Sequence, residues 1–141
     1  MKYGKIVITP MMIATLVSGS VLAHGSYERG ERVAIASPQN LAVVESPFKV
    51  IFSAPEVKIA PAGVDKHNSG HFHLMVDTDA IPTLDEPMME SDKHLRFSAG
   101  ERETTLELSP GEHTLQLIVA DEEHTHFENL VSKKITVYVK R

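Results

Sequence analysis

An all-β fold is predicted by three features of the amino-acid sequence. Apolar and polar residues alternate in short runs, which is the pattern of half-buried strands, and no long segment keeps a helical period. Proline, glycine, asparagine and aspartate separate these runs, as turn residues do. About seven runs follow one another, which is typical of a small two-sheet sandwich. We therefore expect an immunoglobulin-like antiparallel two-sheet sandwich of about seven strands, with a small barrel as the main alternative.

The predicted strands can be placed in order by their apolar residues. In chain order, the residues expected on the inner face are Val33 and Ile35; Phe48, Val50 and Phe52; Phe72, Leu74 and Val76; Leu106 and Leu108; Leu115, Leu117 and Val119; and Ile135, Val137 and Val139. A further short strand is expected from Val57 to Ile59. The turn at Pro110 and Gly111 separates two of the strands, so they can pair as neighbours.

The first 23 residues have the pattern of a secretory signal peptide. Two lysines precede an apolar run, and Val21 and Ala23 occupy the small-residue positions ahead of a cleavage site. The apolar run is shorter than the roughly 20 residues of a membrane-spanning helix and contains a proline. An uncleaved anchor is the alternative. We expect removal of residues 1–23, a flexible amino-terminal arm at 24–32, and a single domain at 33–141.

The composition narrows the classes of function. Loss of the two signal-peptide lysines takes the formal net charge from −5 to −7, and no basic cluster remains. This balance argues against nucleic acid or an anionic membrane surface as a partner. The chain has no cysteine, which excludes disulfides, lipid attachment through cysteine and thiolate metal sites. We expect an exported, soluble periplasmic protein that does not insert into the membrane once the signal peptide is removed.

The segment 78–94 is a long acidic connection that contains two prolines. A loop of this length in a compact domain is usually functional or mobile. A turn of helix around Met88 to Lys93 is one possibility. The acidic residues lack the glycine and the regular spacing of an EF-hand calcium loop, so we favour a solvated connection.

Four stretches of the sequence resemble one bacterial family in content and in order. They are "APAGVDKHNSGHFHLMVD", "HLRF", "ETTLELSPGEHTLQLIVADEEH" and "KKITVYV". On these stretches, which span nearly the whole predicted domain, the chain resembles the domain-of-unknown-function family numbered 4399. Members of this family are typically exported and are often single domains behind a signal peptide. The resemblance implies a fold and a compartment, and it implies no established activity.

The histidines match the pattern of this family in part. The usual first motif of the family is Gly-His-His-His-Leu; His71 and His73 match its outer histidines, and Phe72 replaces the middle one. Downstream, the family's histidines are matched at His94, His113 and His124, nearly matched at His126, and replaced at Arg96.

The eight histidines are the main candidates for chemistry. His71 and His73 lie two positions apart in one predicted strand, so both side chains share a face at a spacing of about 6.5 Å. Two imidazoles at this spacing can converge on one metal ion, each with a nitrogen about 2.0–2.1 Å from it. His124 and His126 form a second such pair if their segment is extended.

The neighbours of the first histidine pair bear on the identity of the metal. Met75 and Asp77 continue the same strand face. Imidazole suits copper, zinc, nickel and iron, and the thioethers of Met75, Met88 and Met89 would favour cuprous ion. The alternative is that the pair forms the ordinary polar face of an edge strand. His113 differs, because it heads an apolar row and is expected to cap the edge of the core.

His24 would become the amino-terminal residue after cleavage. A terminal histidine can chelate copper through its amine and its ring, and a second histidine can complete the site. In outline, "ADEEHTHF" and the leading histidine resemble small exported copper-carrier β-sandwiches, although the stretch has one residue too many. The arm would also have to fold back, at an entropic cost.

These patterns predict a periplasmic domain that binds copper, or alternatively zinc, for storage, delivery or buffering. The expected ligands are His71, His73 and His124, followed by His126 and His94, with Met75 and His24 as further candidates. The chain has no G-x-S-x-G turn and no cysteine nucleophile, so we do not expect an enzyme. The alternative is a metal-free binding or structural module that recognises a cell-envelope protein or glycan through its loops or an open sheet edge.

Overall fold

A computed structural model describes residues 31–63, 69–83, 86–121 and 126–141, without the side chains of His126 and Glu128. The predicted signal peptide lies outside these residues, as does the predicted arm except for its last two residues. Among the residues that are described, no helix is long and apolar enough to cross a membrane.

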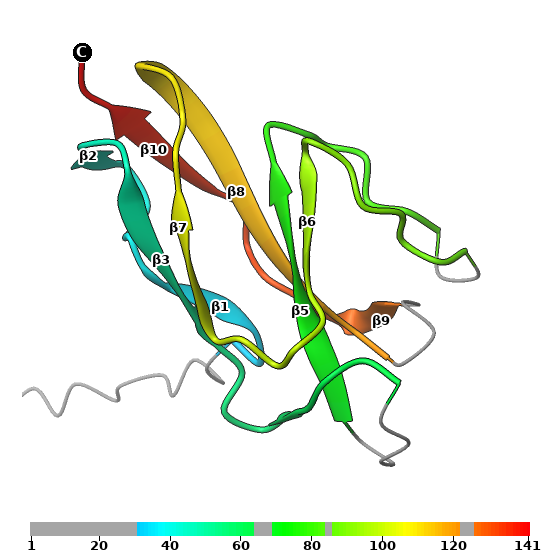
Figure 1. The fold of residues 1–141 in the computed structure, drawn as a ribbon. Helices are drawn as coiled ribbons and strands as arrows, with labels where there is room; N and C mark the ends of the chain where they lie inside the picture. The colour runs from blue at the N-terminus through cyan, green and yellow to red at the C-terminus, as the bar shows by residue number, and fades with distance from the viewer. Residues whose placement is uncertain (1–30, 64–68, 84–85, 122–125) are drawn as a thin grey trace, which may run out of the picture.

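The described chain folds into two facing β-sheets (Figure 1). The smaller sheet has the order β1 (Ala34–Ser37), β3 (Phe48–Ser53), β7 (Glu103–Leu106). The larger sheet has the order β2 (Ala42–Val44), β10 (Ile135–Val139), β8 (Gly111–Ala120), β5 (Ser69–Val76), β4 (Lys58–Ile59), with β6 (His94–Phe97) paired to β5 and β9 (His126–Val131) paired to β8. The predicted all-β sandwich is therefore confirmed.

The structure contains three strands beyond those predicted, and two of its strand pairings are parallel. β2, β6 and β9 were not expected as strands, and each is six residues or shorter. Most pairings are antiparallel as expected, but β2 runs parallel to β10 and β4 runs parallel to β5.

The main core lies between the sheets and consists of the predicted inner-face rows. Phe72, Leu74, Leu117 and Val119 are fully buried there. The ring of Phe52, from the smaller sheet, stacks at a tilt against that of Phe72 with centroids 5.1 Å apart. Period-two alternation therefore correctly identified the face that each long strand presents to the core.

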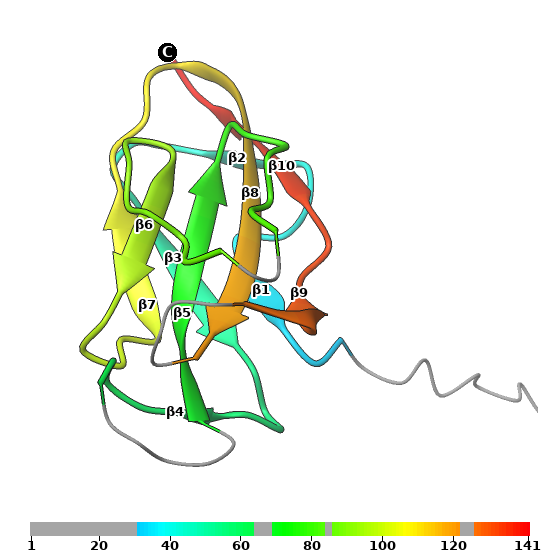
Figure 2. The same cartoon turned by 90° about the vertical axis from the view of Figure 1, so that its right-hand side faces the viewer.

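β5 is an interior strand whose two faces are both buried. β8 pairs with it along one side, and β6 and β4 pair with it along the other. Its outer face is covered by the connection from β5 to β6, which passes in front of β5 and β8 in Figure 2. Met88 of this connection is 1% exposed and packs in a second apolar cluster with Met75, Ile118 and Ala120. The interpretation of residues 69–77 as an edge strand is therefore wrong.

The connection from β5 to β6 is attached to the sheet at both ends. At its beginning, Asp77 adopts a positive φ of 50°, and Lys134 pairs with Asp79. At its end, Ser91 and His94 exchange two backbone hydrogen bonds. The turn of helix considered around Met88 to Lys93 is not formed, because this stretch is a bridge and turn that leads into β6.

Candidate functional site

His71 and His73 lie side by side on the outer face of β5. The alternation that sends Phe72 and Leu74 to the core sends both imidazoles to the opposite face. Their Nε2 atoms are 2.8 Å apart, and the ring centroids are 4.7 Å apart. The two side chains are almost completely buried, with 1% and 0% of their surfaces exposed. The predicted convergence of this pair is therefore present in the structure.

His94 extends the pair into a chain of three histidines. It lies on β6, where its backbone pairs with Met75, and it is also buried. Its Nε2 is 2.8 Å from Nδ1 of His73, and the two ring centroids are 5.0 Å apart. His73 therefore contacts a histidine through each of its two ring nitrogens. We call His71, His73 and His94 the histidine chain.

Each contact in the histidine chain requires one shared proton. One nitrogen of each contact must carry the proton and the other must accept it, because two N–H groups or two lone pairs would repel. A neutral His73 donates through one ring nitrogen and accepts through the other. A protonated His73 donates through both. In either state, these two contacts hold imidazole lone pairs inside the protein, each paired with the N–H of a neighbouring ring.

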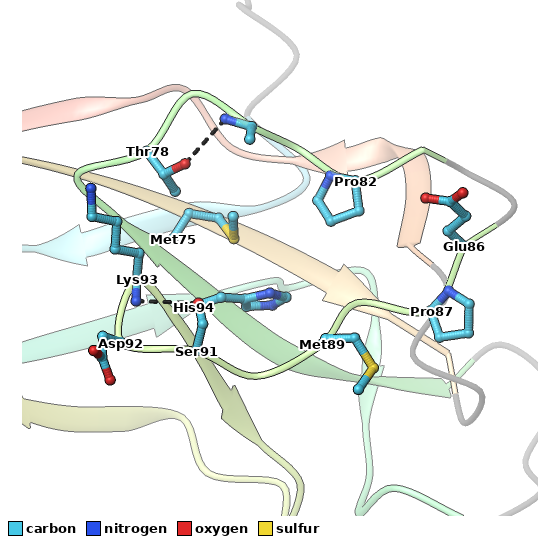
Figure 3. A pocket seen from close by; sticks show the side chains of 11 residues that line it. Met75, Thr78, Pro82, Glu86, Pro87, Met89, Ser91, Asp92, Lys93 and His94 are labelled. Carbon is cyan, nitrogen blue, oxygen red and sulfur yellow. Dashed lines mark hydrogen bonds between the residues drawn. The ribbon is translucent and has the colours of Figure 1, made fainter.

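The covering connection leaves a hollow of about 610 Å³ beside the histidine chain. Met75 and His94 line it from the sheet, and Met89 lines it from the connection (Figure 3). Met89 is largely exposed, in contrast to Met88 beside it in the sequence. The buried chain therefore has one member, His94, at the wall of a hollow.

His113 belongs to a different arrangement, beside the carboxyl end of β5. Its Nδ1 is 2.7 Å from Oδ2 of Asp77, and its Nε2 is 2.8 Å from the carbonyl oxygen of Ser109. Both partners are acceptors, so only the imidazolium form can donate both hydrogen bonds. Partial burial lowers the pKa of His113, but the hydrogen bonds to Asp77 and Ser109 and the charge of Asp77 outweigh it, and the pKa is raised.

Asp77 does not continue the histidine face, contrary to the prediction. Its positive φ takes it out of the strand, and its carboxylate also accepts a hydrogen bond from the backbone N–H of Thr114. Asp77 therefore holds the ends of β5 and β8 together instead of approaching His73. The pairing of Asp77 with His113 was not anticipated, and no spacing rule in the sequence indicated it.

The other predicted ligands lie at different distances from the histidine chain or outside the described residues. Met75 is buried beside the histidine chain, as described above. Ala120 of β8 pairs with His71 of β5 on one side and with His126 of β9 on the other, so the backbone of His126 is two strands from that of His71. His24 and His124 lie outside the described residues.

The histidine chain does not surround a single point. His73 uses its two nitrogens in different directions, so His71 and His94 are on different sides of its ring. Within the part of the chain that the structure describes, no group of three or more histidine, cysteine, aspartate or glutamate side chains is arranged to hold one metal ion. Among the described residues, a metal ion would therefore find two imidazole nitrogens close together, and not three around one point.

Comparisons with known proteins identify the family of this protein but no activity. No curated protein sequence matches the chain. A solved structure, described as Clostridium thermocellum CbhA fibronectin(III)-like modules, is similar at 14% identity and a TM-score of 0.43, covering 77% of this chain and 95% of its own. The family model for a domain of unknown function, DUF4399, matches residues 50–140, which include the whole histidine chain. The protein therefore belongs to the DUF4399 family.

Proposed function

We propose that this protein is an exported, periplasmic domain that binds a transition metal, copper first and zinc as the alternative, for storage, delivery or buffering. The observation that carries the proposal is the pair of Nε2 atoms of His71 and His73, 2.8 Å apart on one strand face. Export rests on the amino-terminal sequence pattern alone.

The spacing of the two nitrogens is close to what an ion needs. Ligand nitrogens about 2.0–2.1 Å from a tetrahedral ion are about 3.3 Å apart, so the pair has to open by about half an ångström. Small rotations of the two rings accomplish this. Both Nε2 atoms must then present lone pairs, so the proton of this contact leaves it.

His94 supports the same site from the other side of His73. Histidines that bind metals usually donate their second ring N–H to a fixed acceptor, which sets the tautomer and the ring orientation. Nε2 of His94 is in position to accept such a bond from Nδ1 of His73. In this proposal His94 is a positioning residue, and His71 and His73 are the ligands.

The surroundings favour a soft ion. Met75 lies on the same outer face, whereas the carboxylate of Asp77 is hydrogen-bonded to His113. Imidazole and thioether donors together suit cuprous ion better than hard cations. The remaining metal ligands are those predicted from the sequence: His124 is the first candidate, and His126 and His24 are the next.

A copper titration of protein exported and processed in a bacterial periplasm tests the proposal, because His24 then carries its native amine. We expect binding of one ion per chain, tighter than about 1 μM, and loss of that binding in the double variant His71→Ala with His73→Ala. His113→Ala is the matched control and should bind like the parent. Undiminished stoichiometric binding in the double variant would overturn the assignment of the ligands.

A metal-free recognition module remains a second candidate because of one exposed edge. Val43 on β2 pairs with Tyr138 on β10, and both are exposed together with Leu41. An apolar patch at a sheet edge is a feature of protein interaction sites. Absence of copper and zinc binding, combined with capture of an envelope protein that Val43→Lys abolishes, would favour this candidate.

A further inference from the structure

We infer that the hollow beneath the connection from β5 to β6 is a separate cuprous-ion entry site, formed by Met89, Met75 and His94, through which copper reaches the histidine chain. The inference rests on the proposed function and adds to it the route by which copper enters and the oxidation state in which it is bound. It starts from the arrangement of three soft donors around one hollow.

The three donors differ strongly in exposure. Met89, on the connection, has 77% of its surface exposed, whereas Met75 on β5 and His94 on β6 are each 4% exposed. All three line the same hollow, and Figure 3 shows the His94 imidazole beneath the connection, between Met75 and Met89 in this view. An ion that arrives from solvent therefore meets a thioether first and a buried thioether and imidazole next.

An exposed methionine calls for an explanation in this fold. Met88, the preceding residue, is 1% exposed and fills the apolar cluster over β5 and β8, so the cover over the sheet does not depend on Met89. The Met89 thioether instead borders a hollow that also contains acidic groups, among them Glu86 and Asp92. The two carboxylates outnumber the one lysine of the lining, Lys93, so the hollow attracts cations weakly, and the thioether selects the soft ones.

The hollow is directly connected to the proposed site. His94 lines it and is 2.8 Å from His73, the histidine that shares its other nitrogen with His71. An ion held by Met75 and His94 is therefore one ring away from the proposed ligand pair. Before transfer, His94 donates its Nε2–H to Nδ1 of His73 and binds the ion through its other ring nitrogen. On transfer the ion exchanges His94 for Nε2 of His73 and of His71, the shared proton moves to Nδ1 of His73, and the proton displaced from the contact of His71 with His73 is taken up by His94. Copper remains cuprous throughout.

The test is the rate of copper loading. Cuprous ion is supplied as its complex with a coloured bidentate chelator, and its transfer to the protein is followed by absorbance for the parent, for Met89→Leu and for Met88→Leu. Leucine keeps the apolar volume and removes the sulfur. Met88→Leu is the matched control, since it changes the adjacent methionine, which does not line the hollow.

We expect Met89→Leu to load cuprous ion about tenfold more slowly, which corresponds to a barrier higher by about 1.4 kcal/mol, while the final stoichiometry is unchanged. Zinc loading of the same variant should keep the parent's rate, because zinc gains little from a thioether. Met88→Leu should load copper at the parent's rate.

The outcomes separate the inference from the proposed function. Equal copper loading by Met89→Leu and the parent would overturn the entry site and leave the ligand pair intact. Equal slowing in both leucine variants, or slowing of zinc as well, would also overturn it, since the cause would then be the packing of the connection. A parent protein that takes up no copper would overturn both proposals.

Discussion

The two histidine arrangements of this domain differ in what surrounds each ring: the histidine chain joins β5 to β6, whereas His113 lies on β8 beside the end of β5. His113 faces a carboxylate and a backbone carbonyl, which both accept hydrogen bonds. His73 faces two other histidines and is completely buried. The acceptors around His113 stabilise a proton on both of its ring nitrogens. In the histidine chain, each pair of contacting nitrogens shares one proton, so one nitrogen of each pair has a buried lone pair.

This difference shows that the number of histidines is a poor guide to metal sites. By sequence, His113 is as close to the family pattern as His71 is. A metal needs a deprotonated nitrogen, and oxygen acceptors on both sides of His113 oppose that state. In the histidine chain each contact joins two imidazole nitrogens that share one proton, and this makes it the better candidate.

The largest effect is expected from replacing the central histidine of the chain. His73→Leu keeps most of the volume but removes both nitrogen contacts, so groups of His71 and His94 lose a buried hydrogen-bond partner. We expect a loss of about 2–4 kcal/mol in the free energy of unfolding, measured by urea denaturation, together with loss of copper binding. His113→Leu should cost about 1 kcal/mol, because its ring is partly exposed. Equal costs would contradict the distinction between the two arrangements.

A smaller effect is expected at the residue that precedes His71. A Cβ on Gly70 would be 2.6 Å from the carbonyl oxygen of Ala120 and 2.6 Å from Cγ1 of Val119, so β5 would have to move away from β8. Gly70→Ala should cost about 1–3 kcal/mol and weaken copper binding without changing any ligand. Gly63→Ala is the control, since that glycine has open space but a positive φ of 74°. It should lower stability by about 1 kcal/mol and leave copper binding unchanged.

The pH dependence of stability provides a sharper test of His113. Its pKa is raised on folding, so its protonated form stabilises the native state; this contribution is complete below the unfolded pKa of about 6.5 and is lost as pH rises through the folded value. Urea denaturation of the parent and of His113→Gln at pH values from 5 to 9 should show the parent's advantage at low pH shrinking on the alkaline side. An advantage that grows with pH would contradict the imidazolium assignment.

The smallest effect is expected at the ion pair of Asp79 with Lys134. Asp79 is fully exposed, although the lysine lowers the pKa of its carboxyl group. Solvent screens such a pair, so Asp79→Asn should leave the urea midpoint and the rate of copper loading unchanged. A marked change in loading alone would show that this contact holds the connection over the hollow.

Much of the fold could be predicted from the sequence because inner-face rows follow a local rule. The alternation in residues 71–76 and 113–120 correctly placed Phe72, Leu74, Leu117 and Val119 in the core. β2 and β6 are three and four residues long, too short for a period to be recognised. Their conformation depends on pairing with strands that are distant in the sequence.

Of the candidate site, the sequence predicted only that His71 and His73 lie next to each other. That pairing follows from strand spacing. Burial of the pair does not, because it requires Met88, on a connection without periodicity, to pack over the sheet. The departure of Asp77 likewise depends on a positive φ at a residue other than glycine, which the alternating pattern does not predict.

The most direct measurement is long-range ¹H–¹⁵N NMR of the imidazole nitrogens, with and without one equivalent of cuprous ion. The account predicts that the signals of Nε2 of His71 and of His73 shift together on metal addition, that Nδ1 of His73 keeps its proton toward His94, and that the signals of both His113 nitrogens stay unchanged. Shifts confined to His113, or no shift at His71 and His73 while copper is bound, would contradict the assignment of the metal to this pair.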